Sequence, residues 1–136
     1  MLQHSLAKVS LQSLSVSVLI LTLLSQFSLE VSLLDTNLMS VPGSLLASAC
    51  LCLAILLLDS STSHLTVWTK NLAFYSGYSQ AAVLELLPRV ASNLVSFIKS
   101  NKLLAIKNKY KSSKFLKVAE LPELTGERIL ELAEGF

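Results

Sequence analysis

Hydrophobic residues are most concentrated between Leu45 and Leu58, where the sequence reads LLASACLCLAILLL. A Pro-Gly-Ser sequence at 42–44 precedes this stretch as a loop and helix start, and the polar residues 59–63 follow it. A helix that is apolar on all sides is normally enclosed by other helices. The pattern therefore predicts a central helix wrapped by the rest of the chain.

Helical signals also flank this central segment. Apolar residues at positions 27, 31, 34 and 38 have the spacing expected for the end of a first helix that reaches Leu38. Thr69 is suited to cap a short helix that runs to Tyr75, and Gly77 is suited to end it. A longer helix is then predicted from the cap residue Ser79 onward.

The helix predicted from Ser79 to Lys99 has two distinct faces. Pro88 lies within it and predicts a local kink. We expect a solvated stripe that consists of Glu85, Arg89 and Asn93. The opposite, apolar face consists of Val83, Leu87, Val90, Leu94 and Ile98.

Shorter helical segments are predicted in the remainder of the chain. A fifth helix is expected from Lys102 to Tyr110, and Ser112-Ser113 introduces a short turn that presents Phe115 and Val118 inward. The acidic end can form a sixth helix from Thr125, as cap, to Ala133, with Gly135 as its stop. Its expected apolar strip consists of Ile129, Leu130 and Leu132.

The predicted fold class is all-α, with five short-to-medium helices and a tail. The length of 136 residues is typical of one domain, and only three Pro and four Gly interrupt the pattern. We divide the chain into a leader with the start of the first helix at 1–26, a main domain at 27–124 and an acidic tail at 125–136.

Hydrophobic residues make up 52% of the chain and charged residues 15%, so a membrane segment has to be considered. The segment from Leu14 to Leu24 is the strongest candidate, but the uncharged window around it contains many Ser, Thr and Gln residues. The apolar stretch from Leu45 to Leu58 is shorter than a membrane span. A small membrane protein therefore remains an alternative, and a folded helical domain is the main hypothesis.

Candidate chemistry is sparse. Cys50 and Cys52 would point apart on a helix, so we expect two buried free thiols in a reducing compartment rather than a disulfide. Neither His4 nor His64 has neighbouring residues at metal-ligand spacing, and no nucleophile or phosphate-binding motif is present. We expect no catalysis, metal or cofactor. The carboxylates of Glu120 and Glu123 are expected at the solvated surface.

Seven of the eleven Lys and Arg residues lie between Lys99 and Lys117, which raises nucleic-acid binding as a second alternative. Helical spacing instead places Tyr110 and Phe115 on an inward face, with the lysines on a solvated face. The aromatic residues Trp68, Tyr75 and Tyr78 are likewise expected to pack inside, with partners for their polar atoms.

Several segments are similar, in order, to motifs of B-type mitotic cyclins. The residues VPGSLLASACLCLA at 41–54 resemble P-P-S-x-x-A-A-x-A-x-x-L-A, with Gly43 where Pro is usual, and WTKNLAFYSGYS at 68–79 resembles W-T-x-x-L-x-x-Y-x-x-Y-[ST]. The residues LLP at 86–88, KNKYKSSKF at 107–115 and LP at 121–122 resemble the family's proline-containing helix, K-x-K-Y-x-x-S-K-[FH] and a closing x-x-L-P. The matching positions, which we expect to be structural, are Pro42, Ala47, Ala49, Leu53, Trp68, Leu72, Tyr75, Tyr78, Pro88, Lys109, Tyr110, Ser113, Lys114, Phe115 and Pro122.

This resemblance implies the C-terminal cyclin box: a five-helix fold in which an apolar central helix is wrapped by the others. It implies a regulatory subunit of a cyclin-dependent serine/threonine kinase in the mitotic cell cycle, found in the nucleus and cytoplasm, with no catalytic role. Family members also carry an N-terminal cyclin box that makes most of the kinase contact. We therefore expect the chain to be a fragment or a short form without that box.

Overall fold

The computed structural model describes residues 2–100 and 103–135, with side chains from residue 16 onward. The all-α prediction is confirmed, because the described residues form α-helices and short 3₁₀ turns without a β-strand. The helices are α1 (Leu2–Ser32), α2 (Gly43–Leu58), α3 (Lys70–Ser76), α4 (Gln80–Lys99), α5 (Leu104–Lys111) and α6 (Glu127–Glu134). The turns are η1 (Thr36–Leu38), η2 (Ser113–Phe115), η3 (Val118–Glu120) and η4 (Pro122–Leu124).

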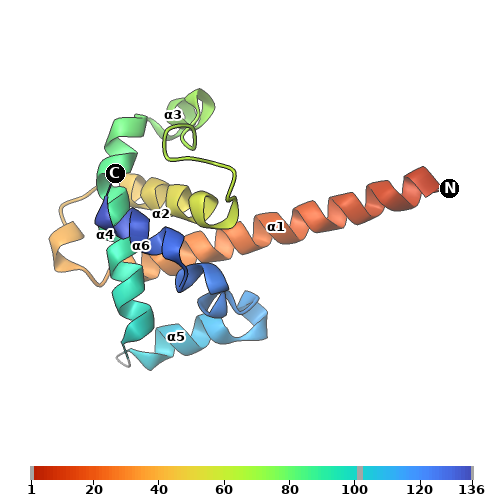
Figure 1. Ribbon diagram of the computed structural model, residues 1–136. Coiled ribbons are helices and arrows are strands. Elements are labelled where there is room, and N and C mark those ends of the chain that lie inside the picture. The colour runs from red at the N-terminus through yellow and green to blue at the C-terminus, as the bar shows by residue number, and fades with distance from the viewer. Residues whose placement is uncertain (1, 101–102, 136) are drawn as a thin grey trace.

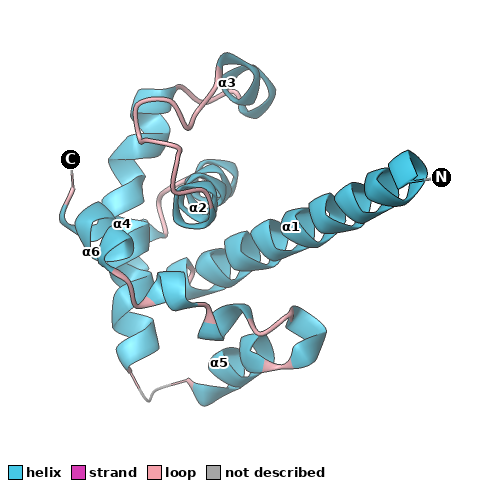
Figure 2. Ribbon diagram, turned by 45° about the vertical axis from the view of Figure 1, so that its right-hand side comes forward, coloured by secondary structure: helices cyan, strands magenta, loops and turns pink. Residues whose placement is uncertain are grey.

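Helix α2 lies at the centre of the bundle, as predicted. It packs against α1 and α4, and α6 packs on α4 (Figure 1). Helix α5 and the turns after it lie on the other side of α1 from α2, while the N-terminal part of α1 extends away from the bundle (Figure 2). The buried side chains of α2 are Leu46, Ala49, Cys50, Cys52, Leu53, Ala54, Leu56 and Leu57.

The two cysteines are free and buried, as expected from their spacing. Burial raises the pKa of the Cys50 thiol to about 12, and burial raises the pKa of Cys52 to about 12 as well. The Cys50 sulfur contacts the hydroxyl of Ser32 on α1, with 3.9 Å between Sγ and Oγ. Both thiols therefore belong to the packed interior between α1 and α2.

The predicted helix caps of the central region are confirmed. The Thr69 hydroxyl accepts a hydrogen bond from the Leu72 N–H (3.2 Å), and the Ser79 hydroxyl accepts one from the Ala82 N–H (3.2 Å). Gly77 ends α3 with a φ of 80°, a left-handed conformation that glycine adopts at little cost. These three residues fix both ends of α3 and the start of α4.

The apolar face of α4 is also confirmed, with a shift at its end. Val83, Leu87, Val90 and Leu94 are buried, whereas Ile98 is half-buried and Phe97 takes the last inward position. The helix is continuous from Gln80 to Lys99 with Pro88 inside it.

Helix α4 is the one helix in the described part of the chain that is long and apolar enough to cross a membrane. This criterion rests on length and composition, and the core helix of a folded domain can also meet it. Leu87 and Leu94 on its apolar face are fully buried within the protein. In the segment from Leu14 to Leu24, Leu24 is also fully buried, and the side chain of Leu14 lies outside the described residues.

The prediction that the first helix reaches Leu38 is wrong, because α1 ends at Ser32. Asp35 takes an extended conformation, and its carboxylate accepts a hydrogen bond from the Asn37 N–H (2.9 Å), which starts the separate turn η1. Leu38 reaches the core from that turn, and Leu34 is 46% exposed. The helix thus ends before Leu38, because the Asp35 side chain starts a new turn although the apolar spacing continues.

The C-terminal predictions are partly corrected. Thr125 does not cap α6, because its hydroxyl donates to the Pro122 carbonyl (3.3 Å) and Gly126 occupies the cap position. Ile129 and Leu132 are buried as expected, but Leu130 is 43% exposed. Gly135 ends the helix with a φ of 98°. The fifth helix begins at Leu104, and the predicted start at position 102 lies outside the described residues.

We expect Ala49→Asp to prevent folding, because Ala49 is fully buried in α2 and an aspartate there would have no counter-charge. The expected loss in the free energy of unfolding exceeds about 4 kcal/mol. The exposed Lys111 on α5 provides a control, and Lys111→Ala is expected to change stability by less than about 0.5 kcal/mol. Urea unfolding followed by circular dichroism tests both variants, and equal stability would contradict the central position of α2.

Candidate interaction site

Two groups of motif residues connect segments that lie far apart in the sequence. In the first group, the indole N–H of Trp68 donates to the Tyr78 carbonyl (3.0 Å), and the Tyr78 hydroxyl is hydrogen-bonded to the Ser44 hydroxyl (2.5 Å). Trp68 is buried and Tyr78 is half-buried. These contacts join the start of α2 to the segments that precede α3 and α4.

The second group is an aromatic cluster where α1, α4 and α5 meet. The ring centroid of Tyr110 lies 4.9 Å from that of Phe27 and 5.2 Å from that of Phe115. Phe27 also contacts Phe97 edge to face, with 5.9 Å between the ring centroids. Tyr110 and Phe27 are fully buried. The predicted inward position of Tyr110 is therefore confirmed, and the cluster joins α1, α4, α5 and η2.

Two lysines of the basic run take part in this packing, so the run is not simply a solvated face. Lys107 is only 7% exposed, and its ammonium donates to the carbonyls of Ile98 (3.1 Å) and Ser100 at the end of α4. Lys109 pairs with Glu30 on α1 (2.7 Å) and lies over the rings of the aromatic cluster. Lys99, Lys111, Lys114 and Lys117 are exposed.

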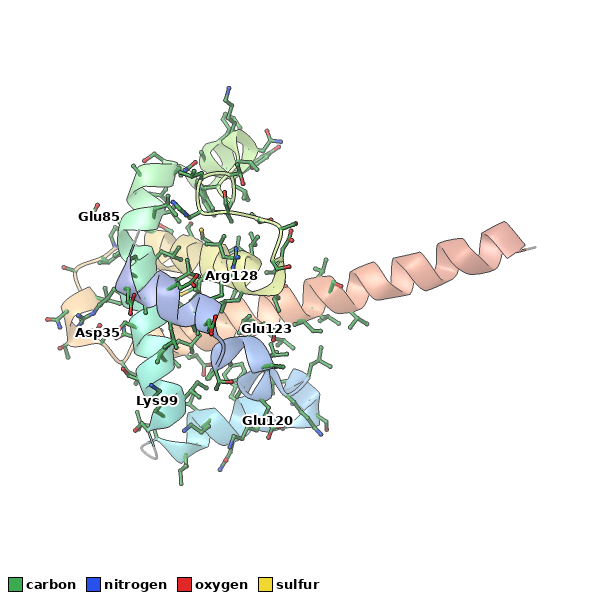
Figure 3. The ribbon with its side chains drawn as sticks, in the orientation of Figure 1. Asp35, Glu85, Lys99, Glu120, Glu123 and Arg128 are labelled. Carbon is green, nitrogen blue, oxygen red and sulfur yellow. The ribbon has the colours of Figure 1, made fainter. Side chains whose placement is uncertain are left out.

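A polar cluster fixes the loop that follows α1. Asp35 lies in the loop beside α4 (Figure 3). Its carboxylate accepts hydrogen bonds from the Arg89 guanidinium (2.6 and 3.2 Å) and from the Asn93 amide (2.8 Å). These donors, above all Arg89, hold the pKa of Asp35 well below its ordinary value of 3.8. Glu85 of the predicted solvated stripe is exposed as expected, but Arg89 and Asn93 also anchor the loop after α1 onto α4.

The remaining carboxyl and phenol groups near these clusters differ in how far they are buried. Burial, together with the nearby carboxylate of Glu30, raises the pKa of the Tyr110 hydroxyl. Glu120 is exposed as expected, but Glu123 is half-buried, with one carboxylate oxygen shielded from solvent. The expectation of full solvation for Glu123 is therefore wrong, because η4 turns this part of the chain back towards the core.

The motif residues do not form one surface. Ala49, Leu53, Trp68 and Tyr110 are buried, and the half-buried group consists of Ala47, Leu72, Tyr78, Pro88 and Phe115. The exposed motif residues are Pro42, Tyr75, Lys109, Ser113, Lys114 and Pro122.

Tyr75 does not pack inside as expected, since its side chain is 84% exposed. Helix α3 has no buried residue, and Phe74 is 81% exposed beside Tyr75, with 5.4 Å between the ring centroids. The helix is only seven residues long and is held mainly through the segments at its ends, so its outer aromatic residues remain at the surface.

Within the described residues, no group of three or more His, Cys, Asp or Glu side chains is placed to hold a metal ion. The two connecting clusters hold helices together through buried rings and hydrogen bonds. This arrangement is suited to presenting a rigid surface to another molecule.

Residues 6–124 match the family model for the cyclin C-terminal domain. The chain belongs to the cyclin family. It is similar to the G2/mitotic-specific cyclin-B of Patella vulgata, with 33% identity over 80% of this chain and 25% of that protein. It is also similar to the G2/mitotic-specific cyclin-B2 of Macaca fascicularis, with 33% identity over 81% of this chain and 27% of that protein. A third relative is the G2/mitotic-specific cyclin-B of Hydra vulgaris, with 34% identity over 82% of this chain and 29% of that protein.

The chain thus spans about a quarter of the length of the curated cyclins it matches. The match confirms the resemblance and the cyclin fold inferred from the motifs. Sequence motifs located Trp68 and Tyr110, but they did not reveal the cyclin domain's Asp35–Arg89 pair. Two features of the sequence pointed to that pair. Asp35 is one of only two acidic residues in the first 58, and Arg89 belongs to a polar stripe on α4.

Replacing Trp68 by Phe should lower the free energy of unfolding by about 1–3 kcal/mol, because the hydrogen bond to the Tyr78 carbonyl is lost within a buried site. The control Tyr75→Phe removes an exposed hydroxyl and should have an effect below about 0.5 kcal/mol. Thermal and urea unfolding of both variants measures the difference. A larger effect at Tyr75 would show that its exposed position is wrong.

We expect Asp35→Asn to destabilise the cyclin domain at neutral pH and to remove part of its acid sensitivity. Because the folded-state pKa of Asp35 is lowered, its stabilising effect is present above its ordinary pKa of 3.8 and is lost as the pH falls below that value. The stability difference between the wild-type chain and Asp35→Asn should therefore shrink from pH 7 towards pH 3. Urea titrations across this range, with the exposed Glu85→Gln as control, would contradict this assignment if the two curves stayed parallel.

Proposed function

We propose that this domain is part of a regulatory subunit of a cyclin-dependent serine/threonine protein kinase that controls the mitotic cell cycle. The observation behind this proposal is the match of residues 6–124 to the cyclin C-terminal domain, together with relatives named as G2/mitotic-specific cyclins. The domain would act through protein–protein contact, without catalysis of its own, in the nucleus and cytoplasm.

The physical mechanism is a shift between conformations of the kinase. A regulator can shift such an equilibrium only by the difference between its affinities for the active and inactive states. It therefore needs a rigid binding surface, and it needs no nucleophile or metal. The hydrogen bonds around Trp68 and the aromatic cluster around Tyr110 supply that rigidity by fixing the helices relative to one another.

The described surface favours a protein partner over nucleic acid. Of the seven basic residues between Lys99 and Lys117, Lys107 and Lys109 are engaged within the protein. The neighbouring surface also exposes Leu104 and Leu116, which are suited to apolar contact. Phe74 and Tyr75 add a further exposed aromatic pair on α3.

A fusion protein tests this proposal. We expect the chain, joined after the N-terminal cyclin box of a cyclin-B relative, to bind the kinase and to activate it about tenfold more than that box alone, which corresponds to about 1.4 kcal/mol. Pull-down measures binding, and phosphorylation of a serine-containing peptide measures activation.

Two further fusions make this test decisive. One carries the relative's own C-terminal domain as the positive control, and the other carries Ala49→Asp to unfold the domain. Kinase activity no higher for the chain's fusion than for the unfolded variant would reject the proposed function, provided that the relative's own domain activates.

A further inference from the structure

A cleft of about 380 Å³ opens between the end of α4, helix α5 and turn η3. Lys107 and Ala119 are buried and form its inner wall, and Leu104, Lys111 and Glu120 are exposed at its rim (Figure 3 labels Glu120). The full lining consists of Ile98, Leu104, Lys107, Lys111, Ala119 and Glu120.

The ammonium of Lys107 has no carboxylate partner among the described residues. It is 7% exposed, donates to the carbonyls of Ile98 (3.1 Å) and Ser100, and lies 5.6 Å from the centre of the Phe97 ring. Carbonyl groups at a helix end carry only partial negative charge, whereas a buried cation is costly without a full counter-charge. An ammonium has three N–H donors, so one remains after these two carbonyls.

The surroundings of Lys107 define the chemistry of a suitable ligand. Lys111 adds a second positive charge at the rim, and Ile98, Leu104 and Ala119 provide aliphatic surface. Glu120 contributes one negative charge on the rim, which disfavours a continuous chain of phosphates but tolerates a single carboxylate placed near Lys111. The volume lies at the lower end of the range of about 300–1,000 Å³ for ligand sites, so it suits a few side chains.

We propose that this cleft binds an acidic segment of a partner protein, with a Glu or Asp carboxylate on Lys107 and Lys111 and a neighbouring aliphatic side chain on Ile98 and Leu104. The buried cation and the cleft complement such a segment in charge and in apolar surface. Neither feature depends on the proposed kinase partner.

Peptide binding to the full chain tests this inference. The probe is a short fluorescein-labelled peptide that carries one Glu beside Leu in an otherwise uncharged sequence, and the matched control replaces that Glu by Gln. We expect the Glu peptide to bind about tenfold more tightly in fluorescence anisotropy, and this preference should decline as salt is added. Equal affinity for the two peptides would overturn the proposal.

Variants locate the binding. Lys111→Gln should weaken binding of the Glu peptide about threefold, and Lys107→Gln should weaken it about tenfold or more. The exposed Lys70 on α3 is the matched control, and Lys70→Gln should leave binding unchanged. Binding that is insensitive to both cleft lysines would overturn the proposal.

A third cleft variant and a nucleic-acid probe complete the test. Because Lys107 also holds the end of α4, Leu104→Ala tests the cleft without touching either lysine, and it should also weaken binding. Circular dichroism confirms that each variant is folded. Tighter binding of labelled single-stranded DNA, with the same dependence on Lys107 and Lys111, would assign the cleft to nucleic acid and reject the peptide.

Discussion

The structure depends on the enclosure of a helix that has almost no polar side. Eight residues of α2 are buried, and by helical spacing they cover more than half of its circumference, so neither α1 nor α4 alone can cover them. The hydrophobic effect therefore requires several helices to assemble around α2 at once. Helix α6 in turn packs on α4.

Polar contacts determine how the covering helices are oriented. Apolar burial is nearly non-directional, so it does not by itself determine how the helices are oriented around α2. Asp35 bonded to Arg89 fixes α1 against α4, and Trp68 bonded to the Tyr78 carbonyl fixes the segments around α3. The ammonium of Lys107 on α5 donates to the Ile98 carbonyl near the end of α4 and so joins the two helices. Each of these contacts joins two segments whose relative position the apolar pattern of the sequence does not determine.

The sequence predicts the features that arise from local rules. The position of α2, the caps at Thr69 and Ser79 and the end of α3 at Gly77 follow from short-range preferences, and all are observed. The end of α1 was missed because the Asp35 carboxylate starts a new turn within an apolar spacing that continues to Leu38. Burial of Lys107 and exposure of Tyr75 were missed because both depend on what lies across the fold. Family motifs identify Tyr75 as a position of interest, but they do not say whether it faces inward or outward.

The buried cysteines of α2 have a practical consequence. Alkylation requires that a reagent reach the thiolate, and both thiols are almost completely buried, which also raises the pKa of each. A cysteine reagent therefore labels Cys50 and Cys52 only in molecules in which α2 has become uncovered. The protein thus contains its own chemical reporter of opening, located in the helix that α1 and α4 cover.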